Sequence, residues 1–170
     1  MKLPLLTSAA FALTAGSAFA ADLRIDIEIP RVQAAEYHLP YVAVWLETPD
    51  QSAVGTLQVW YDVAKRNNEG QNWLAEMRTW WRKTGRTLTL PADGVSGATR
   101  APGRHTLTFR ADNSVLRNLP AGQYTIAVEA AREAGGREVV RVPFQWGGGA
   151  TAASGQGATE LGAISVAVTG

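Results

Sequence analysis

The sequence contains no cysteine, and only two of its 170 residues are histidine. The missing cysteines exclude disulfide bonds, zinc–thiolate sites, thiolate-bound iron–sulfur clusters and covalently attached c-type haem. His38 and His105 are far apart in the chain, and a single histidine in a β-rich sequence is more often a packing or surface residue than a metal ligand. The sequence therefore predicts a protein without zinc, haem or another metal site.

Long hydrophobic runs are also missing. The apolar run near the start of the chain is shorter than the roughly 20 residues that span a bilayer. It follows Met1-Lys2 and ends at Ala18-Phe19-Ala20, and a basic start, a short apolar run and an Ala-x-Ala site are typical of a signal peptide. We expect residues 1–20 to be removed during export and residues 21–170 to form a single domain in the periplasm.

The chain has no excess of charge of either sign. Removing residues 1–20 takes away Lys2 as the only charged residue and leaves 15 basic residues against 15 acidic ones. Such a chain lacks the broad positive surface that attracts nucleic acids or anionic membranes, so we expect no nucleic-acid partner. The remaining residues suffice for one domain with a hydrophobic core.

Alternation of polar and apolar residues dominates the rest of the sequence and is typical of strands with one solvent-facing side. We predict eight strands, at residues 22–29, 42–46, 57–61, 86–90, 104–110, 123–131, 138–146 and 161–168. Residues 48–52 and Gly135-Gly136 are typical of turns. Tyr124 follows Pro120 as in the tyrosine corner of immunoglobulin-like domains. The predicted fold is mainly all-β, an immunoglobulin-like antiparallel β-sandwich.

Two segments depart from the alternation. In residues 71–83 the large apolar residues recur at spacings of three and four, and the last two residues are basic. We predict one inserted helix of about three turns there, outside the sheets. Residues 147–159 are rich in glycine, alanine, serine and threonine, and we expect them to form a flexible loop before the last strand.

The loop after the fourth predicted strand contains Asp93-Gly94-Val95-Ser96-Gly97-Ala98-Thr99. Asp-Gly and Ser-Gly pairs are common in turns, but turn formation explains neither the alanine nor the final threonine. With serine or threonine allowed at both hydroxyl positions, average composition gives this pattern on the order of once per million positions. The pattern therefore calls for a chemical explanation.

The heptapeptide resembles the flavinylation motif Asp-x-x-(Ser/Thr)-Gly-Ala-(Thr/Ser), which FAD:protein FMN transferase reads in its substrate proteins. The resemblance implies that the transferase cleaves FAD and attaches FMN through a phosphoester to the hydroxyl of Thr99. The recognition residues that it implies are Asp93, Gly94, Ser96, Gly97 and Ala98. Residues 157–159 repeat Gly-Ala-Thr without the upstream aspartate, so we expect Thr159 to stay unmodified.

From about residue 22 to residue 168, the chain also resembles a periplasmic family of unknown function (DUF2271). The segments that carry this resemblance are NWLAEMRTWWRKTGR, DGVSGATRAPG, VEAAREAGGREVVRVPF and ELGAISV. The resemblance implies an association with membrane electron-transfer proteins of the PepSY type. It thus implies an exported carrier that passes electrons from such a partner to an extracytosolic acceptor such as ferric iron, and a redox carrier or reductase component more than a self-contained enzyme.

Trp80 and Trp81, near the end of the predicted helix, offer indole rings on which an attached flavin would stack. Aromatic residues at helical spacing more often belong to a core, so both interpretations stay open. The two neighbours lie roughly 100° apart around a helix axis and cannot both face one core. Arg100, next to Thr99, would either pair with the attached phosphate or remain a solvated surface charge.

Two other functional classes compete with the electron carrier. A flavin-free, immunoglobulin-like binding or accessory module has the same fold class, because fold does not determine function. Such a protein would be colourless, with Thr99 unmodified. A hydrolase is disfavoured because Ser96 does not lie in a Gly-x-Ser-x-Gly motif, since Ala98 occupies the position of the last glycine.

Overall fold

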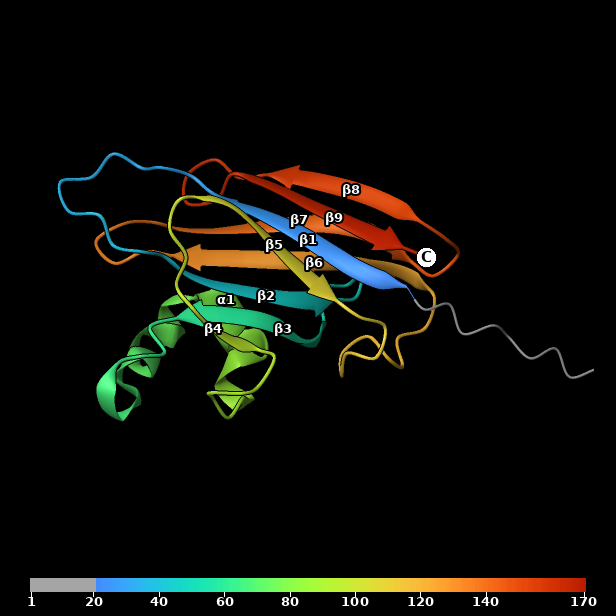
Figure 1. The fold of residues 1–170 in the computed structure, drawn as a ribbon, viewed down its shortest axis with the longest axis horizontal. Helices are drawn as coiled ribbons and strands as arrows, with labels where there is room; N and C mark the ends of the chain where they lie inside the picture. Colours follow the sequence, from blue (N-terminus) through green and yellow to red (C-terminus); the bar gives the residue numbers. More distant parts are fainter. Residues whose placement is uncertain (1–20) are drawn as a thin grey trace, which may run out of the picture.

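A computed structural model describes residues 21–170 as a β-sandwich of two sheets (Figure 1). The predicted signal peptide lies outside the described residues. The first sheet has the spatial order β5 (Gly103–Phe109), β1 (Asp22–Ile29), β9 (Ala163–Thr169) and β8 (Thr151–Gln156). The second has the order β4 (Ser96–Ala98), β3 (Ala53–Tyr61), β2 (Tyr41–Glu47), β6 (Gly122–Ala131) and β7 (Arg137–Trp146). The predicted all-β sandwich is confirmed.

The main core lies between the two sheets and is formed by the alternating apolar residues of the strands. In β1, the side chains of Leu23, Ile25 and Ile27 are fully buried, and their polar neighbours face the other way, as the period of two requires. Neighbouring strands are antiparallel except for β3 and β4, which run parallel. The Tyr124 hydroxyl donates a hydrogen bond of 2.9 Å to the Pro120 carbonyl, so the tyrosine corner is confirmed.

A helical layer covers the outer face of the second sheet (Figure 1). It consists of η1 (Arg66–Glu76), α1 (Arg78–Lys83) and η2 (Gly85–Thr87). Leu74, Met77 and Trp80 of this layer are buried against Trp45 and other apolar residues of the sheet. Within residues 21–170, no helix is long and apolar enough to cross a membrane.

The predicted helix at residues 71–83 is confirmed in place but is not continuous. Its first half is a 3₁₀ helix, and the backbone leaves helical geometry at Met77, with ψ at 71°. A new helix begins directly afterwards because the buried Glu129 carboxylate accepts hydrogen bonds from the Thr79 and Trp80 amides, at 3.1 and 2.7 Å. A side chain from β6 thus caps α1, where the local sequence offers no cap.

Two sequence-based predictions of local structure are wrong. Residues 86 and 87 belong to η2, and residues 88–90 are irregular, instead of forming a strand. Residues 151–156, expected to be part of a flexible loop, form β8, which pairs with β9 along its length. The small side chains of β8 have a packing reason, since a Cβ at Gly155 would come within 3.0 Å of the Val142 side chain on β7. The close approach of β8 to β7 therefore favours a glycine at this position, and glycine is also typical of loops.

Candidate functional site

The motif residues lie at one end of the second sheet, where β3, β4 and β6 end and β2 and β7 begin. Ser96, Gly97 and Ala98 form β4, which pairs with β3 at the edge of the sheet. The turn before β4 is held by Ser96, whose hydroxyl accepts a hydrogen bond of 3.0 Å from the Ala92 amide. Asp93 is exposed to solvent. The side chain that accepts a hydrogen bond from the backbone of this turn is therefore Ser96 and not Asp93.

The two glycines of the motif serve different local requirements. Gly94 has a φ of +72°, in the left-handed region that side chains disfavour. Gly97 lies close to the side chains of β3, and a Cβ there would come within 3.0 Å of Gln58 Nε2 and 3.1 Å of Trp60 Cδ1. A glycine at position 97 therefore allows β4 to pack over the buried indole of Trp60.

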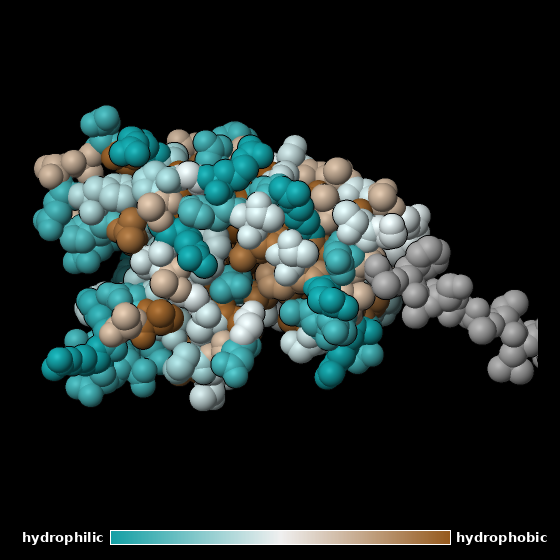
Figure 2. Space-filling model, in the orientation of Figure 1, coloured by the Kyte–Doolittle hydropathy of each residue, from teal (hydrophilic) through white to brown (hydrophobic). Residues whose placement is uncertain are grey.

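Thr99 follows β4 directly and lines a cavity of about 710 Å³. The cavity volume falls within the range of about 300–1,000 Å³ that is usual for small-molecule and cofactor sites. Figure 2 shows the molecule hollowed at this end, between the helical layer and the rest of the sandwich, with mainly hydrophilic residues around the hollow. Thr99, Asp62 and Lys65 lie on one side of the cavity. The β6–β7 hairpin forms another wall, and His38 lies at the edge.

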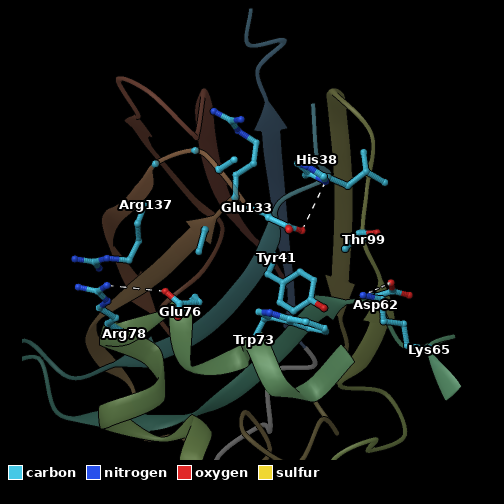
Figure 3. A pocket seen from close by; sticks show the side chains of 16 residues that line it. His38, Tyr41, Asp62, Lys65, Trp73, Glu76, Arg78, Thr99, Glu133 and Arg137 are labelled. Carbon is cyan, nitrogen blue, oxygen red and sulfur yellow. Dashed lines mark ion pairs between the residues drawn. The ribbon is translucent and has the colours of Figure 1, made fainter. Parts of the chain in front are cut away.

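Tyr41 and Trp73 lie between two groups of charged residues that line the cavity (Figure 3). Asp62 and Lys65 lie on one side, and Glu76, Arg78 and Arg137 lie on the other. Trp73 is 44% exposed, although most large apolar side chains of this layer are buried. The Lys65 ammonium lies 4.2 Å from the centroid of the Trp73 ring, which is a cation–π contact. The cavity therefore contains an accessible indole with a cation at its surface.

The segment that carries Trp73 is anchored against the end of β3. A Cβ at Gly70 would come within 2.0 Å of the Asp62 carbonyl oxygen, so η1 passes directly over this backbone. The Tyr41 hydroxyl donates a hydrogen bond of 2.9 Å to the Gly70 carbonyl. Burial raises the pKa of Tyr41, so the hydroxyl keeps this proton at neutral pH.

The cations around the cavity fall into two groups. Arg132 and Arg137 are held by buried carboxylates: Arg132 forms two hydrogen bonds with Glu160, at 2.9 and 3.0 Å, and Arg137 lies 2.7 Å from Glu129. The hydrogen bonds with Glu160 raise the pKa of Arg132 despite its burial. Both guanidinium groups are therefore held at the β6–β7 hairpin by ion pairs with buried carboxylates.

Lys65 and Arg78 are paired more loosely. Lys65 lies 3.9 Å from Asp62, and Arg78 lies 3.9 Å from Glu76. All four side chains are well exposed, and exposed pairs of this kind contribute only about 0–1 kcal/mol each. These two cations can therefore exchange their present partners for an anionic ligand at little cost in free energy.

The family described as predicted periplasmic protein (DUF2271) matches residues 22–163. The chain belongs to this family. The family description agrees with the periplasmic location expected from the start of the sequence. No curated protein and no solved structure matches the chain.

In this DUF2271 protein, the tryptophans expected beside a flavin do not line the cavity. Trp80 is fully buried, and its indole N–H donates a hydrogen bond of 3.0 Å to the Thr56 hydroxyl. Trp81 is partly buried and packs against the same outer core, so the expectation that the two neighbours cannot both face one core is wrong. Trp80 therefore has no accessible face for a ligand, and Trp73 is the tryptophan that lines the cavity. No signal in the sequence separated Trp73 from the others, because its exposure depends on how the helical layer packs on the sheet.

Arg100 also lies away from the cavity that Thr99 lines. Its guanidinium is 5.5 Å from the ring of Trp60, which belongs to the core between the sheets. The physical reason is the path of the chain, since residues 99–102 cross from the second sheet to β5 in the first. On the side of Thr99 the nearby cation is Lys65, which lies with Asp62 on the same side of the cavity (Figure 3).

The second Gly-Ala-Thr sequence of this DUF2271 protein has different surroundings. The Glu138 carboxylate accepts hydrogen bonds from the amides of residues 158–161 and a further one, of 3.2 Å, from the Thr159 hydroxyl. Burial raises the pKa of Glu138, but the amide hydrogen bonds outweigh burial and hold it below the ordinary value of 4.5. The Thr159 hydroxyl is thus tied to an ionised carboxylate, whereas Thr99 borders an open cavity.

Proposed function

We propose that this periplasmic protein is an electron carrier with FMN attached to the Thr99 hydroxyl through a phosphoester. The observation that carries the proposal is the position of Thr99. The residue that the motif specifies as the acceptor lines a cavity of cofactor size, about 710 Å³. The chemical nature of the lining also fits FMN, because an exposed indole suits an aromatic ring and loosely paired cations suit a phosphate or an anionic ring.

The attachment uses the hydroxyl of Thr99 as the nucleophile. Thr99 Oγ1 forms a bond to the phosphorus on the FMN side of FAD, the pyrophosphate bond breaks, and AMP leaves. The hydroxyl proton passes to a base, because a neutral hydroxyl is a weak nucleophile without one. We assign this base and any metal ion to FAD:protein FMN transferase. Since β4 is an edge strand, one side of the motif backbone is open to the transferase.

The chain itself would bind and orient the cofactor. When attached, FMN would supply the electron-transfer chemistry, and the tether would retain it in a compartment from which free cofactor diffuses away. A membrane protein of the PepSY type is the proposed electron donor, and an extracytosolic acceptor such as ferric iron is the proposed destination. This function requires Thr99 and the cavity that it borders.

The test is co-expression of the exported protein with an active FAD:protein FMN transferase, followed by intact mass measurement and peptide mapping. We expect one FMN adduct, on the peptide that contains residues 93–99, and none on the peptide that contains residues 157–159. A protein already known to accept FMN, expressed in the same cells, verifies that the transferase is active. With that control positive, an unmodified chain would refute the carrier and favour a flavin-free binding module.

A further inference from the structure

We infer that the cavity beside Thr99 is the seat of the flavin ring, with Trp73 as its aromatic platform and Lys65 as the cation that stabilises the reduced ring. This inference rests on the proposed attachment to Thr99 and deepens it by assigning the residues that bind the ring. It is carried by the exposure of Trp73, the cation–π contact of Lys65 and the place of Thr99 in the same cavity.

Trp73 is suited to be the platform because its position is fixed while its ring stays accessible. Gly70, three residues earlier, lies against the Asp62 backbone and accepts the hydrogen bond from Tyr41. Leu74, the next residue, is buried in the outer core. The backbone on both sides of Trp73 is therefore held in place, yet the indole itself is 44% exposed. Trp73 therefore presents an apolar aromatic face to the cavity.

Lys65 is the cation best placed to act on a ring at this platform. Its ammonium already lies 4.2 Å from the Trp73 centroid and is only loosely paired with Asp62. Arg132 and Arg137 are held by Glu160 and Glu129, and a turn toward a ligand would leave each buried carboxylate without its cation. Lys65 therefore carries the available positive charge on the side of Thr99.

The charge of Lys65 has a consequence for the redox potential. Reduction places negative charge on the flavin ring, and a nearby cation stabilises that charge more than it stabilises the oxidised ring. The negative charge of Asp62 opposes this stabilisation. Separation of the Lys65–Asp62 pair when the ring docks would therefore strengthen the effect of Lys65 on the reduced flavin. Removal of the Lys65 charge should lower the midpoint potential of the attached flavin.

The first experiment compares Trp73→Phe with Trp81→Phe in the flavinylated, full-length protein. Both variants lose one indole, but only Trp73 lines the cavity. Indole stacked on a flavin quenches its fluorescence, so the Trp73 variant should show a longer flavin fluorescence lifetime than wild type. The Trp81 variant should match wild type. Intact mass measured on each sample establishes that the adduct is present.

The second experiment compares the midpoint potentials of Lys65→Gln, Lys65→Arg and Arg100→Gln. We expect a lower potential for Lys65→Gln, a potential near wild type for Lys65→Arg, and no shift for Arg100→Gln, which removes the same charge one residue from Thr99 but on the side of Trp60. If the flavinylated Trp73 and Lys65 variants both behave as wild type, the seat is wrong although the attachment stands. If wild type carries no FMN, the attachment and the seat both fail.

Discussion

At the scale of single residues, the last three positions of the motif differ in what surrounds them. Gly97 lies against Trp60 and Gln58, Ala98 is exposed, and Thr99 borders the cavity. Small residues beside the acceptor are also what a transferase needs in order to fit the segment into its own active site. Gly97 has a reason within this chain as well, since a Cβ there would come within 3.0 Å of Gln58 Nε2 and 3.1 Å of Trp60 Cδ1, so that these side chains would have to shift.

Substitution at positions 97 and 98 separates these two requirements. Gly97→Val should lower the free energy of unfolding by about 1–3 kcal/mol, because the new side chain overlaps the packed Trp60. Ala98→Val adds two methyl groups on the solvent side and should change stability by no more than about 0.5 kcal/mol. Urea unfolding measures both values. Equal stability of the two variants would show that Gly97 is not needed for packing.

At the scale of the elements, the helical layer depends on one buried side chain from the sheet. Glu129 on β6 caps α1 through the Thr79 and Trp80 amides and also pairs with Arg137, which borders the cavity. Its side chain is completely buried, and without it the buried Trp80 amide would lack a partner. The start of α1 directly after η1 therefore depends on this contact.

Glu129→Ala should therefore destabilise the protein by about 1–3 kcal/mol, since it leaves buried donors unsatisfied. The near-ultraviolet circular dichroism of the buried Trp80 should change with it. Glu76→Ala removes an exposed carboxylate from the same layer and should stay within about 0.5 kcal/mol of wild type. A Glu129→Ala protein as stable as Glu76→Ala would contradict the capping role.

The elements differ in how far the sequence predicts them. Strands such as β1 and β6 were predictable because their apolar residues alternate. β8 was not, because its small side chains reflect close packing against β7 and resemble a loop in composition. Thr99 could be singled out from the motif alone. The cavity around it could not, because Lys65, Trp73 and the β6–β7 hairpin come together only through the tertiary fold.

At the scale of the whole molecule, Glu138 connects the two sheets. It lies on β7 of the second sheet and accepts hydrogen bonds from the amides of residues 158–161, in the loop between β8 and β9 of the first. Its pKa is held below 4.5 in the folded protein. The unfolded chain therefore binds more protons than the folded one in the pH range between the two values, and acid favours unfolding there.

Glu138→Gln should be less stable than wild type at neutral pH, and the difference should shrink as the pH falls below about 4.5, through the pKa of the folded state. Urea midpoints measured for both proteins from about pH 7 to about pH 3 test this. Other carboxylates with a lowered pKa, such as Glu47, are present in both proteins and cancel in the comparison. A difference independent of pH would show that the carboxylate charge of Glu138 does not contribute.

The central claim is that Thr99 carries FMN, and the most direct measurement is the intact mass of three forms purified after co-expression with the active transferase. Wild type and Thr99→Ser keep a hydroxyl at position 99 and should both carry one FMN. Thr99→Val keeps the shape of threonine without the oxygen nucleophile, and it should fold normally and carry none. An FMN adduct on Thr99→Val, or an unmodified wild type beside a modified control substrate, would contradict the account.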